Sequence, residues 1–84
     1  METRIAVIAI IVKSGSGSVA QLNTLLSSYS EYFVGRMGIP YRAKGVNIIS
    51  VVVDAPQDEI SALSGRIGKL PGISVKTAYA PSEE

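Results

Sequence analysis

Cysteine, histidine and tryptophan are absent from this chain of 84 residues. Without cysteine and histidine, the chain can form no disulfide, offer no thiolate or imidazole to a metal, and use neither side chain in catalysis. The carboxylates Asp54, Asp58 and Glu59 cluster in the sequence and are explained by their position at the start of a predicted helix. We therefore predict no enzymatic activity, no catalytic residue, no metal site and no cofactor, and we expect a cytoplasmic protein.

Charged and aromatic residues are also scarce. Charged residues make up 18% of the chain and aromatic residues 6%, whereas hydrophobic residues make up 46%. An average globular protein has about 25% charged residues. The net charge is +1, and the eight basic residues are scattered along the sequence, so we predict no direct contact with nucleic acid. A small, apolar and weakly charged domain has a surface suited to association with other proteins.

Long apolar segments are missing as well. The longest run, Ile5–Val12, is far shorter than the roughly 20 residues that a membrane-spanning helix needs, so we predict no membrane contact. This run is rich in β-branched residues and apolar on both alternating faces, which is typical of a strand buried on both sides. Val46–Val53 has the same character. Both segments are expected at the centre of a sheet.

Two amphipathic helices are predicted between the strands. Ser18 and Gln21 have the spacing of a capping box, which predicts a helix from Ser18 to about Ser30. Asp54 and Gln57 form a second capping signature, and Pro71-Gly72 ends the helix that follows. The apolar stripes of the two helices are Val19, Leu22, Leu25, Leu26 and Tyr29 in the first, and Ile60, Leu63, Ile67 and Leu70 in the second.

Two further strands complete the domain. The segment 32–41 contains Pro40, which cannot donate to a strand ladder and so indicates an edge strand. The segment 73–79 alternates apolar and polar residues, as a strand with one buried face does. The element order is βαββαβ. It predicts one α+β domain over residues 1–84, a ferredoxin-like, ACT-like sandwich with a four-stranded antiparallel sheet and two helices on one face.

Two groups of residues are candidates for binding. The loop 14–18 ends at a helix N-terminus, where backbone N–H groups can hold a carboxylate or phosphate, although a flexible turn before a capped helix also explains it. Three basic residues near the predicted hairpin could contact an anion or an acidic partner, or could be solvated charges that protect a sheet edge. The tentative ligand-binding residues are Gly15, Ser16, Gly17 and Ser18, and the tentative anion or partner contacts are Arg36, Arg42 and Lys44.

The chain resembles a family of small ACT-like regulators of the iron-only hydrogenase system, related in fold to the C-terminal domain of nickel-responsive repressors. The matching stretches are Arg4–Val12, the Val-Gly-Arg-Met-Gly-Ile-Pro-Tyr segment 34–41, Val46–Asp54 with the helix after it, and residues 70–77. The resemblance implies an ACT-type fold, oligomerisation through the sheet and a role in hydrogenase assembly or expression. ACT domains often bind amino acids near the first strand–helix loop, which is the loop 14–18 here. Nickel binding does not carry over, because the chain lacks histidine and cysteine.

These observations favour a non-enzymatic, homo-oligomeric regulatory module with a small-molecule effector. The alternatives are a ligand-free structural or protein-interaction subunit and, less favoured, a small cofactor-free enzyme. Two helices can cover only one side of the predicted sheet, yet both central strands are apolar on both sides. The uncovered side is expected to bury itself against a second copy of the chain as a dimer, which a further contact could extend to a tetramer.

Overall fold

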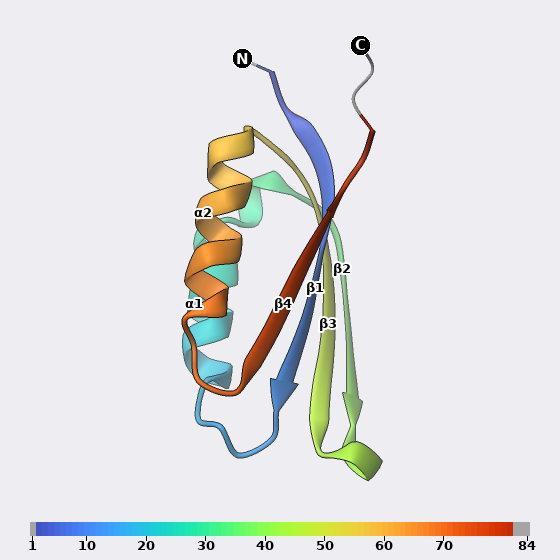
Figure 1. Ribbon diagram of the computed structural model, residues 1–84, viewed down its shortest axis with the longest axis vertical. Helices are drawn as coiled ribbons and strands as arrows, with labels where there is room; N and C mark the ends of the chain where they lie inside the picture. Colours follow the sequence, from blue (N-terminus) through green and yellow to red (C-terminus); the bar gives the residue numbers. More distant parts are fainter. Residues whose placement is uncertain (1, 82–84) are drawn as a thin grey trace.

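The computed structural model describes residues 2–81, and its elements follow the predicted order (Figure 1). Short 3-10 helices, Ser30–Tyr32 and Arg42–Lys44, flank the second strand. The main elements are β1 Arg4–Lys13, α1 Val19–Ser28, β2 Phe33–Tyr41, β3 Val46–Ala55, α2 Gln57–Gly68 and β4 Ile73–Tyr79. Both helices lie on one face of the sheet, which confirms the predicted ferredoxin-like α+β fold.

The four strands form one sheet in the order β2-β3-β1-β4, and every neighbouring pair is antiparallel. The two central strands, β1 and β3, are the two that the sequence shows to be apolar on both faces. Their register pairs Arg4 with Ala55 at one end and Lys13 with Val46 at the other. Pro40 lies on the edge strand β2, as predicted, where its missing N–H costs no ladder bond.

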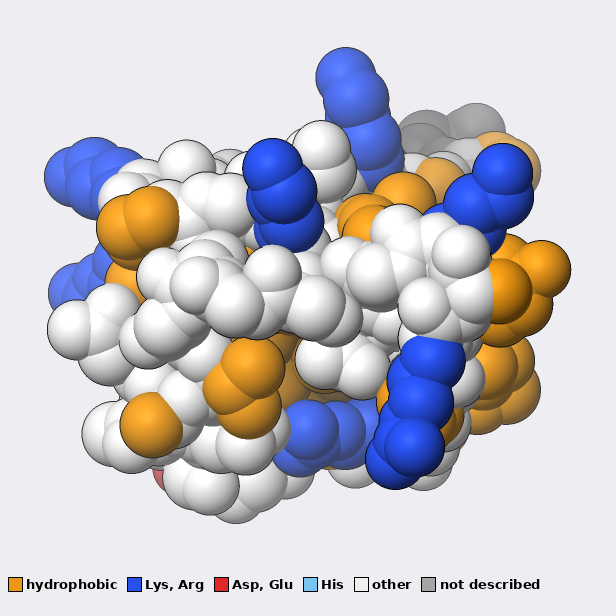
Figure 2. Space-filling view, turned by 90° about the horizontal axis from the view of Figure 1, so that it is seen from below, with side chains coloured by type: hydrophobic (Ala, Val, Ile, Leu, Met, Phe, Trp, Pro, Cys, Tyr) orange, Lys and Arg blue, Asp and Glu red, His pale blue; other side chains and the backbone are white. Residues whose placement is uncertain are grey.

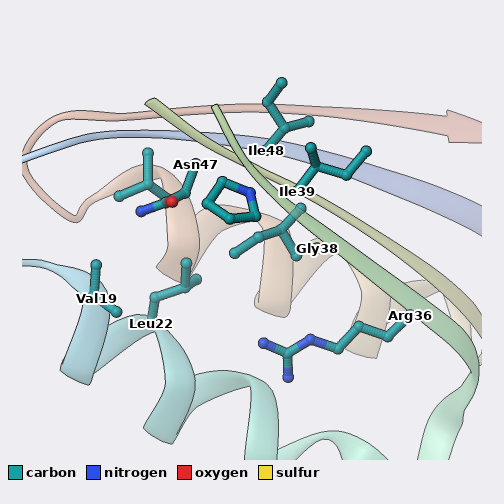
Figure 3. Close-up of a pocket in the computed structure, with 10 residues that line it drawn as sticks. Val19, Leu22, Arg36, Gly38, Ile39, Asn47 and Ile48 are labelled. Carbon is teal, nitrogen blue, oxygen red and sulfur yellow. The ribbon is translucent and has the colours of Figure 1, made fainter. Parts of the chain in front are cut away.

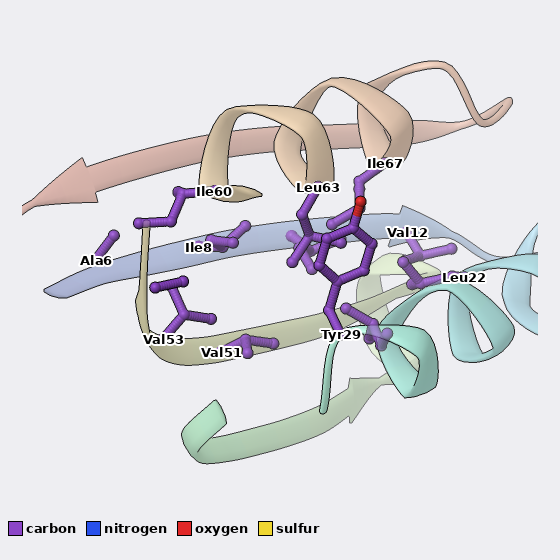
Figure 4. Packing of buried hydrophobic residues seen from close by; sticks show 13 residues of the cluster. Ala6, Ile8, Val12, Leu22, Tyr29, Val51, Val53, Ile60, Leu63 and Ile67 are labelled. Atoms are coloured by element: carbon purple, nitrogen blue, oxygen red, sulfur yellow. The ribbon is translucent and has the colours of Figure 1, made fainter. Parts of the chain in front are cut away.

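The hydrophobic core lies between the sheet and the helices (Figure 4). Alternate residues of β1 point into it, and Ile8, Ile10 and Val12 have no exposed surface. The core consists of Ala6, Ile8, Ile10 and Val12 on β1, Val51, Val53 and Ala55 on β3, and Leu22, Leu26, Tyr29, Ile60, Leu63 and Ile67 from the helical layer. The other alternate residues of β1, such as Ile5 and Ile11, remain exposed on the far side of the sheet.

The predicted capping box at Ser18 is wrong. The Ser18 side chain makes no bond to the start of α1, and its hydroxyl instead donates to the carbonyl oxygen of Pro71, 2.6 Å away. Ser18 is buried, and a buried hydroxyl is stable only where it finds a partner. The turn after α2 supplies that partner. Ser18 therefore ties the two strand–helix units together and does not cap its own helix.

The second capping prediction is also wrong at Asp54. Asp54 is still part of β3, where it pairs with Ile5, and Pro56 stands at the N-terminal boundary of α2 without a side-chain cap. The strand pairing extends two residues beyond the predicted end and takes Asp54 out of reach of the helix. Asp58 and Glu59 do lie in the first turn of α2, where the positive helix end favours acidic side chains.

Candidate functional site

Three connections meet at one end of the molecule, the lower end in Figure 1, which we call the loop end. They are residues 14–18 after β1, residues 42–45 between β2 and β3, and residues 69–72 after α2. Two backbone hydrogen bonds of 2.8 Å join them, from Ser14 N–H to the Gly45 oxygen and from Lys13 N–H to the Gly72 oxygen. Segments far apart in the sequence therefore form one surface.

The loop end is basic. Figure 2 shows this end with Lys and Arg side chains around it and hardly any acidic side chain in view. Lys13 ends β1, Arg42 and Lys44 lie in the hairpin, and Lys69 follows α2. The acidic residues that the structure describes lie at or next to the other end of the sheet; they are Glu2, Glu31, Asp54, Asp58 and Glu59. Four of the eight basic residues, distant in sequence, are therefore gathered at this end by the antiparallel topology, while Arg4, Arg36, Arg66 and Lys76 lie elsewhere.

An open groove of about 680 Å³ crosses the loop end. Lys13 and Lys44 lie along it, with Ser14 and Ser74 as neutral polar neighbours. The rest of its wall comes from Ile11, Gly45, Val46, Gly72 and Ile73. Two ammonium groups that share one groove favour an anion there, since no acidic residue lines it. Of the three basic residues predicted as anion contacts, Lys44 lies in this groove and Arg42 lies in the same hairpin.

The predicted glycine-serine loop contributes backbone and few available side chains. Gly15 and Gly17 have positive φ angles of 82° and 80°, and a Cβ on either would meet nothing within 4 Å. The Ser16 hydroxyl accepts a hydrogen bond of 3.4 Å from the Ser18 N–H, and Ser18 is buried with its hydroxyl donated to Pro71. The exposed parts of this loop are therefore Ser14, which lines the groove, and the peptide groups around the two glycines.

Arg36 does not join the other two basic residues. It lies further up β2, and its Nη2 donates to the side-chain oxygen of Asn23 on α1 at 3.2 Å. A separate pocket opens beside it between α1 and β2. This pocket was not predicted from the sequence, although a signal exists: Gly38 and Pro40 alternate with apolar residues on an edge strand and offer little side-chain volume on one face.

The side of the sheet that faces away from the helices, which we call the open face, is mostly apolar. The strand pairing puts on this face the alternate residues of each strand that point away from the core. Val7 of β1, for example, lies beside Val52 of β3 and Ala78 of β4. Ile5, Ile11 and Met37 are 51%, 45% and 58% exposed. Its apolar residues are Ile5, Val7, Ala9, Ile11, Met37, Ile39, Tyr41, Val46, Ile48, Val52 and Ala78. The groove at the loop end borders this face through Ile11 and Val46.

The acidic end has its own internal contacts. Arg4 lies 4.4 Å from the centre of the Tyr79 ring and donates to Gln57 at 2.7 Å, which holds the start of β1 against β4 and α2. The contacts of Arg4 join three elements, β1, β4 and α2, at this end.

Partial burial raises the pKa of the Tyr32 phenol above its usual range, and the negative charges of Glu59 and other nearby carboxylates raise it further.

Within residues 2–81, no three acidic side chains come together in a way that could hold a metal ion. Neither helix of this part of the chain has the length and apolar character needed to cross a bilayer.

The fold and its surfaces define the class as a small ACT-like α+β domain with one uncovered sheet face. The chain belongs to the TM1266-like family, whose model matches residues 4–77 and carries the description "Iron-only hydrogenase system regulator, putative". Its structure is similar to that of the uncharacterized protein TM1266 from Thermotoga maritima, with a TM-score of 0.92 and 35% sequence identity over 95% of this chain and 100% of that one. No curated protein matches the sequence. The family description places the chain among regulators and describes no enzyme.

Proposed function

We propose that the protein is a non-enzymatic regulatory module that self-associates through the open face and responds to a small anionic effector at the loop end. The observation that carries this proposal is the exposed apolar surface of the two central strands. Val7 and Ile48 are each 37% exposed on the two central strands, and Ile48 lies directly beside the more exposed Ile11 of β1. Soluble monomers rarely expose contiguous apolar patches larger than a few hundred Å².

A second copy of the chain is the occupant that fits this face best. An 84-residue domain hides only about 60–65% of its unfolded surface, so burial between copies adds stability that the single domain lacks. A two-fold contact lets one self-complementary surface bury itself twice, and it is the commonest arrangement of soluble oligomers. Lys13, Lys76 and Asp54 lie on the open face with the apolar residues, and their charges limit how the two sheets can align.

We expect the wild-type protein to be an oligomer at micromolar concentration and Val7→Lys to be a folded monomer. The substitution places an ammonium group at the middle of the open face, where two copies would each have to bury it. Loss of a well-packed apolar contact at the centre of an interface costs about 2 kcal/mol or more of binding free energy, so association should weaken by at least about 30-fold. Sedimentation velocity across a dilution series measures this, with circular dichroism as the test of folding.

Ser27→Lys is the matched control, because it adds the same charge at an exposed position of α1 on the helical side. It should leave the oligomer intact. A wild-type chain that stays a folded monomer at micromolar concentration contradicts the proposed self-association.

The effector part of the proposal rests on the position of the groove. Lys13 and Lys44 lie where the loop end meets the open face, so an anion bound between them changes the charge beside the interface. A ligand shifts an association equilibrium only as far as it binds the two states differently. Because the groove borders the proposed interface, a bound anion would interact differently with the single chain and with the associated chains.

We expect an anionic metabolite to raise the melting temperature of the wild-type chain, and the double variant Lys13→Gln, Lys44→Gln to lose the response. Binding at one hundred times Kd stabilises the folded state by about 2.7 kcal/mol. The measurement is a thermal-shift screen over phosphate, nucleotides and amino acids. Lys69→Gln, which removes a positive charge outside the groove, is the control. If no compound shifts the wild type, the ligand-free structural subunit becomes the better description.

A further inference from the structure

A pocket of about 350 Å³ opens between α1 and β2, on the helical side of the sheet (Figure 3). In Figure 3, Val19 and Leu22 face it from α1, and the Arg36 side chain extends toward α1 from β2. We call it the Arg36 pocket. Its lining is Val12, Val19, Leu22, Arg36, Gly38, Ile39, Pro40, Asn47, Ile48 and Ile49. Apart from Arg36 and Asn47, every residue in this wall is apolar.

The hollow follows from the sequence of the edge strand. Register places Arg36 opposite Val51, which is completely buried beneath the helices, and Gly38 opposite Ile49. The helix-facing positions of β2 beyond Arg36 are therefore Gly38 and Pro40, which bring little side-chain volume. A Cβ built on Gly38 would meet nothing within 4 Å. The space that a larger residue would fill is left open between β2 and α1.

Arg36 supplies one charge at this apolar site. A guanidinium carries five N–H donors, and the hydrogen bond found for it within residues 2–81 goes to the neutral amide oxygen of Asn23 at 3.2 Å. No acidic residue lines the pocket. No carboxylate in the pocket wall therefore neutralises the positive charge of Arg36. A planar guanidinium of this kind matches the geometry of a carboxylate, which can accept two parallel hydrogen bonds.

We propose that the Arg36 pocket binds a short aliphatic carboxylate, with its carboxylate on Arg36 and its hydrocarbon chain against Val19, Leu22 and Ile49. The volume lies at the lower end of the range of about 300–1,000 Å³ for small-molecule sites, which fits a compact ligand. The apolar wall excludes a second charge on the ligand. The same wall disfavours a sugar or nucleotide, whose many polar groups would find no partners there.

This site goes beyond the proposed function and can be tested apart from it. The residues proposed to contact the ligand, Arg36, Val19, Leu22 and Ile49, lie on the helical side, although Ile39 and Ile48 of the pocket rim also belong to the open face. The proposed effector groove lies at the loop end. A wild-type chain that forms the oligomer but binds no carboxylate would overturn the proposed ligand site alone. Loss of the oligomer with ligand binding intact would overturn only the self-association.

The probes are butanoate, hexanoate, 1-hexanol and hexylammonium, titrated into the wild-type chain and followed by backbone amide NMR shifts. Hexanoate should shift the amides of Leu22, Gly38 and Ile49 and bind more tightly than hexanol. Each added methylene should strengthen carboxylate binding by about three- to fourfold until the pocket is full. Hexylammonium should bind most weakly because its charge repels Arg36.

Two variants assign the contacts. Arg36→Gln should weaken hexanoate about tenfold and leave hexanol unchanged, because it removes the charge-assisted hydrogen bonds and keeps the apolar wall. Gly38→Leu should fill the pocket and abolish binding of both probes. Arg36 is exposed, so its variant is expected to fold even if the Gly38 variant does not. Equal affinities for hexanoate and hexanol, no effect of Arg36→Gln, or no shifts at these amides would each overturn the proposal.

Discussion

Ile10→Ala should lower the free energy of unfolding by about 2–5 kcal/mol, which is the usual cost of truncating a large buried side chain. Ile10 lies on β1 at the centre of the core, with no exposed surface, opposite Ile49 and Val75 of the neighbouring strands. The sheet on both sides is held by backbone pairing and cannot collapse into the cavity. Marginal stabilities of about 0.05–0.15 kcal/mol per residue make this a large fraction of the total. Urea unfolding followed by circular dichroism measures it.

Ile11→Ala is the control for this prediction, because the next residue along β1 points to the open face. Ile11 is 45% exposed, so its truncation should cost less than about 1 kcal/mol in dilute solution. Where the protein self-associates, the cost of Ile11→Ala should grow with protein concentration, whereas that of Ile10→Ala should change little. Equal losses for the two variants in dilute solution would contradict the assignment of the two faces.

Gly72→Ala should destabilise the fold by about 2–4 kcal/mol. Gly72 has a φ of +70°, a conformation that costs an L-residue about 1–2 kcal/mol. In addition, a Cβ at this position would lie 2.6 Å from the Cβ of Ser16, so the loop before α1 must move. That movement strains the hydrogen bonds from Lys13 to Gly72 and from Ser18 to Pro71. Denaturant unfolding of the variant gives the cost directly.

Gly45→Ala separates the two causes of this loss. Gly45 has a similar φ of +66°, but a Cβ there meets nothing within 4 Å. Its substitution should therefore show the conformational cost alone. Adding Ser16→Gly to Gly72→Ala should recover part of the steric cost, because it removes the Ser16 Cβ with which the new Cβ at position 72 clashes. The account fails if Gly45→Ala and Gly72→Ala cost the same and the second substitution recovers nothing.

Strand patterning allowed most of the fold to be predicted. Runs such as Ile5–Val12 are apolar on both parities, which favours a central position, so the sequence alone places β1 and β3 at the centre of the sheet. In the single chain, one parity of β1 nevertheless remains exposed on the open face. The helix starts could not be placed in this way. A serine or aspartate before a helix resembles a cap, but the tertiary structure decides which group its side chain contacts. The Ser18 hydroxyl donates to the Pro71 carbonyl, 53 positions away, and Asp54 remains in the sheet.

The surfaces were harder to predict than the core. Lys13, Arg42, Lys44 and Lys69 look scattered because their closeness depends on three loops meeting at one end. The Arg36 pocket was not predicted for a related reason. Gly38 and Pro40 indicate that one face of β2 has little side-chain volume, but the sequence does not show that α1 lies across from that face. The face of each β1 residue was also undetermined from sequence, because both parities are apolar. Packing beneath the helices decides it, and it places Ile8 inward and Ile11 outward.

The separation of basic and acidic residues gives this nearly neutral molecule a permanent electric dipole along its length. The backbone extends 42 Å along its longest axis, with Lys13, Lys44 and Lys69 at one end and Asp54 and Asp58 at the other. Two copies that approach with parallel axes bring like charges together. Two copies that approach antiparallel place each basic end beside the partner's acidic end. At low ionic strength, where such fields extend tens of ångströms, this polarity selects the antiparallel encounter before the apolar faces touch.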